Sequence, residues 1–130
     1  MEKNKAIFIN AWPYQKDKMN LPVRNLESSI SFYENVMGFK IFNNKDLSCK
    51  TLMLRRDGVE IGLAENGGDP SQDGCFFEVD NVHSALDEMK AKGMDPKMEL
   101  QTQKHGDTQW KVYFIIAPDR LCYCIGERQK

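Results

Sequence analysis

The chain has no long hydrophobic run, no strong net charge and no cluster of basic residues. Its longest apolar stretch, residues 112–118, is far too short to cross a bilayer. The 18 Lys and Arg residues nearly balance the 19 Asp and Glu residues, and no basic run is longer than the pair Arg55-Arg56. These absences predict no nucleic-acid partner and no membrane partner.

The cysteines and the start of the chain also lack a recognisable pattern. The four cysteines, at positions 49, 75, 122 and 124, do not have the paired spacing of a zinc site. No apolar signal core follows the charged residues 1–5. We therefore expect reduced thiols and a cytoplasmic location.

What the sequence does contain is an internal repeat. Residues 23–30 (VRNLESSI) resemble residues 79–86 (VDNVHSAL), at an offset of 56. Later positions match at an offset of 62: Asp57 with Asp119, Leu63 with Ile125, and Glu65 with Glu127. The repeat predicts a single domain over residues 1–130, built from two similar units at about 15–66 and 74–128.

Each unit contains a helix with clear ends. Asn25 and Asn81 stand at N-cap positions, and apolar residues then recur at helical spacing. Gly38 and Gly93 follow the apolar stripes, where a glycine commonly ends a helix. The predicted helices cover residues 26–37 and 82–92.

Extended segments surround both helices. Alternation of apolar and polar residues predicts a strand before each helix, within residues 18–23 and 74–79. After the helices, the predicted strands cover residues 40–43, 51–56 and 59–64, then 98–103, 112–117 and 121–126. The apolar run at residues 6–9 lies outside the repeat and is predicted to add an edge strand.

Two segments of the chain form recognisable motifs: residues 21–33 (LPVRNLESSISFY), followed by 36–39 (VMGF), and residues 77–82 (FEVDNV). They resemble the first and second motifs of the vicinal oxygen chelate superfamily, the glyoxalase and bleomycin-resistance group. The ending at 125–127 (IGE) is similar to the bleomycin-resistance-like branch. The resemblance implies an α+β fold in which two βαβββ units form an open rolled mixed sheet around a cleft, with the helices outside.

The resemblance also implies where a metal would be held. Metal-dependent members carry His or Gln on the first strand of each unit and Glu on the last. The corresponding positions here are Lys18, Gly62, Gly74 and Cys124. Only Cys124 could ligate a divalent metal, and one ligand does not make a site. We therefore predict no metal and no cofactor.

Strand alternation places a set of mostly polar residues on the sheet face opposite the helices. They are Lys18, Asn20, Glu60, Phe76, Glu78, Cys122 and Cys124. Trp110 is added to them because its position in the sequence is close to that at which bleomycin-resistance-like relatives have a Trp in the binding cleft. These eight residues are the predicted ligand-binding residues.

Several of these residues allow more than one role. Glu78 could act as a general base in a partly apolar cavity, or form a structural pair with Lys18. Cys122 and Cys124 fit a pocket wall of small apolar side chains, or a reactive thiol. His105 is predicted in a loop near the mouth of the cleft.

The predicted function is metal-independent binding of a small aromatic or amphipathic molecule, resembling bleomycin-resistance-type sequestration. The resemblance further implies a homodimer with clefts shared between subunits. The near-neutral net charge of −1 does not favour the cationic drug bleomycin as the ligand. The alternative is a glyoxalase-like lyase or dioxygenase-type metalloenzyme with displaced ligands such as Glu60, Glu78 or Cys124. A sensor or partner-binding module is a third class that the sequence leaves open.

Overall fold

A computed structural model of the chain describes most of its residues. The described segments are residues 6–13, 21–43, 51–65, 67–70, 74–94, 97–118 and 120–129. Lys18 and Asn20, two of the predicted site residues, lie outside these segments. Within the described segments, no helix is long and apolar enough to cross a membrane.

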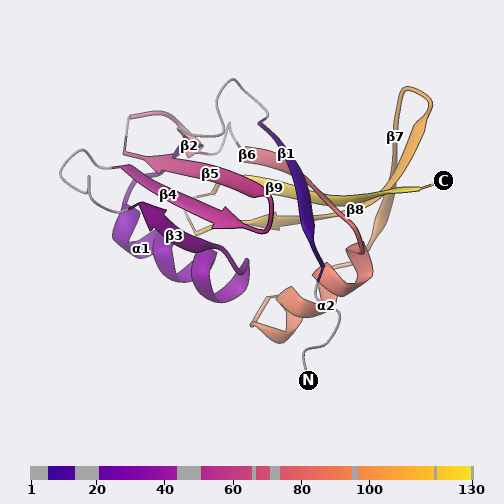
Figure 1. Cartoon of the computed structure of the whole chain (residues 1–130), viewed down its shortest axis with the longest axis horizontal. Helices are drawn as coiled ribbons and strands as arrows, with labels where there is room; N and C mark the ends of the chain where they lie inside the picture. The colour runs from indigo at the N-terminus through magenta and orange to yellow at the C-terminus, as the bar shows by residue number, and fades with distance from the viewer. Residues whose placement is uncertain are drawn as a thin grey trace.

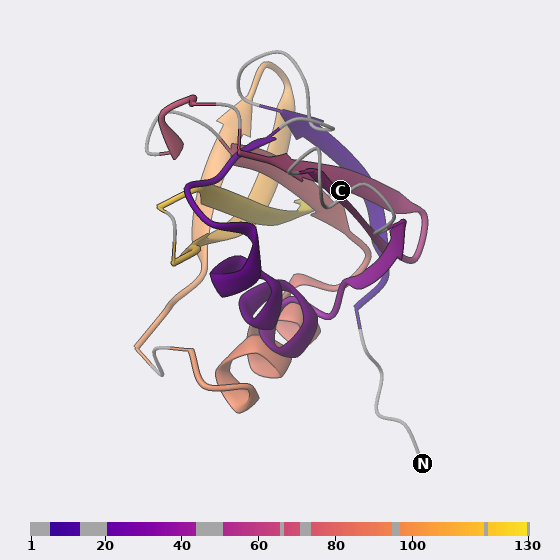
Figure 2. The same cartoon turned by 90° about the vertical axis from the view of Figure 1, so that its left-hand side faces the viewer.

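The described residues form two β-sheets with helices on one side (Figures 1 and 2). The elements are β1 (Phe8–Pro13), β2 (Leu21–Pro22), α1 (Leu26–Ser31), η2 (Phe32–Val36), β3 (Lys40–Asn43), β4 (Thr51–Arg56), β5 (Val59–Ala64), β6 (Gly74–Val79), α2 (Val82–Ala91), β7 (Gln101–His105), β8 (Thr108–Ile116) and β9 (Cys122–Gln129). Sheet A has the strand order β1-β6-β9-β8-β7, and sheet B the order β2-β5-β4-β3. The β7–β8 hairpin extends away from the helices (Figure 2).

The same strand order occurs in both halves of the chain. In each half the first strand pairs in parallel with the fourth, and the third and second strands come next across the sheet, giving the orders β2-β5-β4-β3 and β6-β9-β8-β7. The register also agrees, because Leu21 lies opposite Leu63 and Phe77 lies opposite Ile125. The predicted α+β fold with two βαβββ arrangements is confirmed.

Equivalent side chains cap the two helices. The Oδ1 atoms of Asn25 and Asn81 each accept a hydrogen bond at 3.0 Å from the backbone N–H three residues ahead. Glu65 Oε2 accepts from the N–H of Leu26, and Glu127 Oε1 accepts in the same way from Val82, both at 2.9 Å. Pairs of residues that match in the sequence repeat therefore satisfy equivalent helix N–H groups, and the two predicted caps are confirmed.

The first helix covers the predicted length but changes type within it. It is α-helical over Leu26–Ser31 and π-helical over Phe32–Val36, where Met37 N–H donates to the carbonyl of Phe32 at 3.1 Å. Apolar periodicity at about 3.6 residues per turn does not predict this wider turn, which buries Phe32, Tyr33 and Met37 and leaves Val36 half-buried. Gly38 then ends the helix at a φ of +76°, as predicted.

The apolar N-terminal run forms an edge strand, as predicted. β1 pairs antiparallel with β6 at the edge of sheet A, and Trp12 lies opposite Phe76. Phe8 also joins the β4–β5 hairpin of sheet B, because its N–H donates to Asp57 Oδ2 at 2.9 Å. Its carbonyl accepts from the N–H of Gly58 at 3.4 Å. β1 therefore links the two sheets.

One continuous core lies between the helices and the sheets. Its largest fully buried side chains include Phe8, Tyr33, Phe39, Phe77, Tyr113 and Tyr123. The hydroxyl groups of Tyr33 and Tyr123 hydrogen-bond to each other across the two halves of the chain. Removal of these aromatic side chains from water is the main stabilisation of the fold.

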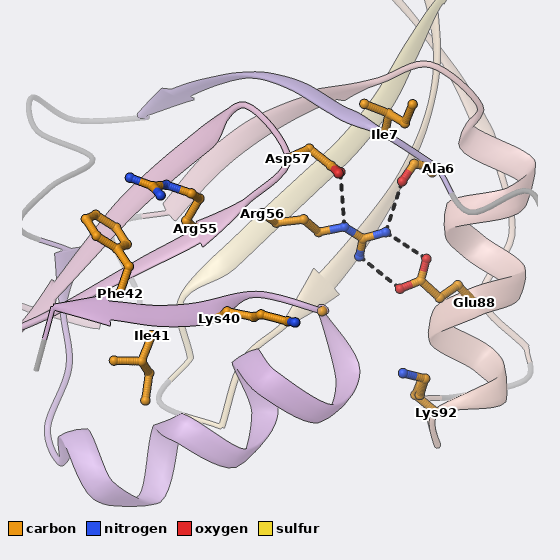
Figure 3. A pocket seen from close by; sticks show the side chains of 11 residues that line it. Ala6, Ile7, Lys40, Ile41, Phe42, Arg55, Arg56, Asp57, Glu88 and Lys92 are labelled. Atoms are coloured by element: carbon orange, nitrogen blue, oxygen red, sulfur yellow. Dashed lines mark hydrogen bonds and ion pairs between the residues drawn. The ribbon is translucent and has the colours of Figure 1, made fainter. Parts of the chain in front are cut away.

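The side chain of Arg56 ties three parts of the chain together (Figure 3). Its Nη1 donates to the carbonyl of Met37 at 2.6 Å, and its Nη2 donates to the carbonyl of Ala6 at 3.0 Å. The same two atoms donate to both carboxylate oxygens of Glu88 on α2, at 2.9 and 2.8 Å. The side chains of Arg56 and Glu88 are only 7% and 9% exposed, so each buried charge depends on the other.

We expect Arg56→Met to lower the free energy of unfolding by about 3–5 kcal/mol, because it leaves a buried carboxylate without its partner. The matched control is Arg55→Met. Arg55 pairs with Glu60 at 2.8 Å, but these side chains are 50% and 44% exposed, and such pairs contribute about 0–1 kcal/mol. Urea unfolding followed by circular dichroism measures both variants. Equal decreases in the free energy of unfolding for Arg56→Met and Arg55→Met would contradict a larger contribution from the buried pair.

Candidate functional site

Sheet A separates its side chains into two sets. On β6, β8 and β9, the residues that face the helices include Phe77, Tyr113 and Tyr123, and all three are fully buried. Their neighbours Phe76 and Cys124 point to the opposite face, as strand alternation requires. The second face is free to form a site because the helices cover only the first.

A pocket of about 590 Å³ lies on this second face. We call it the aromatic pocket. Its lining residues are Trp12, Pro13, Phe76, Gln103, His105, Trp110, Phe114, Cys122 and Cys124. They come from β1, β6, β7, β8 and β9, all of which belong to sheet A. Within the described residues, sheet B contributes nothing to the lining. The expectation that both units line one cleft within the chain is therefore not met there.

Aromatic rings form the wall of this pocket. The ring of Phe76 meets Trp110 edge to face at 5.0 Å between centroids, and Trp12 meets Trp110 in the same way at 6.3 Å. The imidazole of His105 lies 5.8 Å from the ring of Phe76. On the other side of Trp110, the guanidinium of Arg128 lies 5.2 Å from the ring centroid. These contacts hold the rings in fixed orientations before any ligand arrives.

Gly126 makes this packing possible. A Cβ atom at this position would lie 2.8 Å from Cζ of Phe76 and 2.8 Å from Cγ1 of Val112. Because such distances are far below van der Waals contact, any side chain would push Phe76 off β9. The absence of a side chain at Gly126 therefore lets Phe76 pack against β9 beside Val112.

The two cysteines of β9 form the floor between the rings. Cys124 is buried, and Cys122 is half-buried. Burial raises the pKa of Cys124 to about 12, and the neighbouring Cys122 adds to the rise. A thiol that keeps its proton is a small apolar group rather than a nucleophile, which supports the pocket-wall interpretation.

The structure brings together four of the eight predicted site residues, namely Phe76, Trp110, Cys122 and Cys124. Glu78 shares their face but does not line the pocket, and its Oε1 accepts from Asn10 Nδ2 at 2.7 Å. Glu60 lies on sheet B and pairs with Arg55, so its expected place beside the others is wrong. Its strand alternates correctly, but alternation does not show which sheet a strand joins. The proposed pairing of Glu78 with Lys18 lies outside the described residues.

Five lining residues are not among the eight predicted ones: Trp12, Pro13, Gln103, His105 and Phe114. His105 is the last residue of β7, not part of a loop, and Gly106 turns the chain at a φ of +64° into β8. The Gly-Asp pair at 106–107 is a turn signal that predicts this hairpin. Phe114 follows from the alternation of β8, whereas Trp12 follows only from its register against Phe76.

Comparison with known proteins identifies the family. Residues 16–114 match the family described as the Glyoxalase/Bleomycin resistance protein/Dioxygenase superfamily. The chain belongs to this superfamily. The resemblance seen in the two sequence motifs is confirmed.

The chain is similar to proteins of the superfamily with different descriptions. A lactoylglutathione lyase of Neisseria meningitidis is 30% identical over 112 residues, which cover 76% of this chain and 80% of the relative. A crystal structure of a bleomycin-binding protein complexed with bleomycin has a TM-score of 0.65 at 21% identity, covering 89% of this chain and 98% of that one. A virulence protein from Salmonella typhimurium has a TM-score of 0.68 at 19% identity, covering 87% and 95%. These two structures establish the shared fold alone.

The residues at the superfamily's metal-ligand positions do not fit a metal. Gly62 and Gly74 have no side chain, so among the three described positions only Cys124 has an atom that could ligate, and one ligand does not make a site. A divalent ion needs deprotonated thiolate, neutral imidazole or carboxylate ligands. Within the described segments, no three His, Cys, Asp or Glu side chains come together in a metal-binding group. The fourth position, Lys18, is not described.

Cys124 is expected to resist alkylation until strongly alkaline pH. With a pKa of about 12, roughly one thiol in ten thousand is ionised at pH 8, and the thiolate is the reactive form. Because the raised pKa belongs to the folded chain, unfolding restores ordinary reactivity. Iodoacetamide labelling at pH 8 in buffer and in urea, read by peptide mass spectrometry, measures the difference. Equal rates at Cys124 in the two conditions would contradict it.

Proposed function

We propose that the aromatic pocket binds a small aromatic or amphipathic molecule without a metal. The observation that carries this proposal is the chemistry of the wall. Four aromatic side chains line a volume of about 590 Å³, and the described lining contains no Lys, Arg, Asp or Glu. Cavities of this size and polarity are typical of sites for small organic ligands.

Burial of the ligand supplies most of the affinity in this proposal. A ligand ring that loses about 100 Å² of apolar surface gains roughly 2.5 kcal/mol. Edge-to-face contact with Phe76 or Trp110 adds about 0.5–1.5 kcal/mol. The polar ends of Gln103 and His105, which lie 2.9 Å apart, provide hydrogen-bonding groups at one side of the pocket. They would orient a ligand that carries one polar group.

The bleomycin-binding relative supports small-molecule binding but not bleomycin itself. Bleomycin is cationic, this chain has a net charge of −1, and the described lining has no carboxylate to receive a cation. A neutral aromatic compound fits the wall better. The cytoplasmic location remains a prediction.

A glyoxalase-like lyase is the second candidate, and the 30% identity to the lactoylglutathione lyase favours it. The proposed displaced ligands do not converge, because Glu60 is on sheet B whereas Glu78 and Cys124 are on sheet A. Metal analysis of untagged protein separates the two candidates. A stoichiometric metal that survives dialysis, together with lyase activity on a glutathione hemithioacetal, would overturn the binding proposal.

We also propose that a second copy of the chain covers the open side of the aromatic pocket. Three large apolar residues are exposed on this face: Trp12 (44%), Phe114 (38%) and Ile116 (61%). A group of exposed apolar side chains on one face is typical of a surface that another protein covers. Sedimentation velocity should then give a mass of about 30 kDa, twice the 15.0 kDa of one chain. Ile116→Arg should dissociate the dimer, whereas Ile7→Arg, outside the aromatic pocket, should not. A wild-type monomer at 100 μM contradicts this arrangement.

Phe114→Ala is expected to weaken ligand binding about tenfold, because it removes one aromatic wall worth about 1.4 kcal/mol. Phe42→Ala is the matched control, since Phe42 is exposed to the same extent (39% against 38%) but does not line the aromatic pocket. The chain has two tryptophans, Trp12 and Trp110, and both line the pocket. Their fluorescence therefore reports binding of hits from a library of small aromatic compounds. Equal affinities of the two variants would contradict the assigned site.

A further inference from the structure

A second cavity, of about 540 Å³, lies away from the aromatic pocket (Figure 3). Its walls come from β3, the end of β4, the α2 helix and the chain just before β1. No described residue lines both cavities. We call this cavity the basic groove, after the Lys and Arg side chains on its walls.

The acidic residues of the basic groove are already occupied by groups of the protein. Both carboxylate oxygens of Glu88 accept from Arg56, and Asp57 Oδ2 accepts from the N–H of Phe8. Arg56 is in turn satisfied by Glu88 and by two backbone carbonyls. These groups form a network behind the groove in which one guanidinium meets two carboxylates, so its formal charge is −1, smaller than the +2 of the two lysines on the groove walls.

Two lysines remain on the walls. Lys40 and Lys92 are exposed and line the groove, and neither has an acidic partner within the described segments. Figure 3 shows their ammonium groups reaching toward the space in front of Arg56 from β3 and from the end of α2. Lys40 also lies directly opposite Arg55 in the β3–β4 pairing, where like charges repel. The groove therefore has an excess of positive charge that an anion would relieve.

Apolar side chains complete the groove. Ile7 is 51% exposed and Phe42 39% exposed, and Figure 3 shows them on opposite sides of Arg55 and Arg56. The guanidinium of Arg55 stacks on the ring of Phe42 at 4.3 Å, which fixes the ring against β4. The helix dipole explains a lysine near the end of α2. It does not explain apolar side chains left in water next to two lysines.

We propose that the basic groove binds a small amphipathic anion, in which a carboxylate or phosphate group is joined to a short apolar body. The anionic group lies between the ammonium groups of Lys40 and Lys92, and the apolar body lies against Phe42, which shares one face of β3 with Lys40. This site is independent of the aromatic pocket and of any ligand proposed for it.

The test uses ¹⁵N-labelled full-length protein titrated with 3-phenylpropionate and, separately, with phenyl phosphate at low salt. The uncharged 3-phenylpropionamide is the matched compound. We expect saturable shifts at residues 40–42, 55–57 and 88–92 with the anions and at least tenfold weaker binding of the amide. The two anions together show whether the groove prefers a carboxylate or a phosphate. Tryptophan fluorescence reports any separate binding of these phenyl compounds to the aromatic pocket, because both tryptophans line it, whereas the shifts at residues 40–42, 55–57 and 88–92 report the groove.

The variant Lys40→Gln/Lys92→Gln should weaken anion binding at least tenfold while its unfolding curve stays that of the wild type, because both side chains are exposed. Arg24→Gln/Lys104→Gln, which removes the same charge from exposed positions outside the groove, should bind as wild type. Equal binding of anion and amide at the groove, shifts confined to residues 103–114, or unchanged affinity of the Lys40/Lys92 variant would each overturn the proposal. So would the absence of any shift at 10 mM probe.

Discussion

One buried ion pair, Arg56 with Glu88, connects parts of the fold that the shared apolar core alone does not hold in register. It joins the end of β4 to α2, and the same guanidinium holds the carbonyls at the end of the first helix and before β1. Gly38 is required beside it, because a Cβ there would lie 2.6 Å from Nη1 of Arg56. The pair therefore determines how the two halves of the chain meet, in addition to the apolar core that both share.

The aromatic pocket follows from this arrangement. The helices and the core occupy one face of sheet A, so its other face is left to collect the rings of β1, β6 and β8. Gly126 allows Phe76 to lie on β9, and the protonated thiol of Cys124 keeps the floor apolar. Arg56 and Glu88 also line the basic groove, which is charged where the aromatic pocket is apolar.

The residues that the two halves of the chain share are residues that stabilise the fold, and they are not metal ligands. Asn25 and Asn81 cap equivalent helices, and Glu65 and Glu127 accept from equivalent N–H groups. At the superfamily's ligand positions the chain has glycine and a protonated cysteine instead. The match over residues 16–114 shows the membership of the superfamily, whereas the function is argued from the aromatic pocket.

The sequence by itself determined the helix caps, the strand alternation and the superfamily, because these depend on residues close together in the chain. It also placed Phe76 and Cys124 correctly on one face, since period-two alternation needs no partner strand. Only the tertiary structure decided that Trp12 joins them, that Glu60 does not, and that the described lining comes from sheet A alone. Those outcomes depend on which strands pair and in which register, and such long-range pairing leaves no local pattern in the sequence.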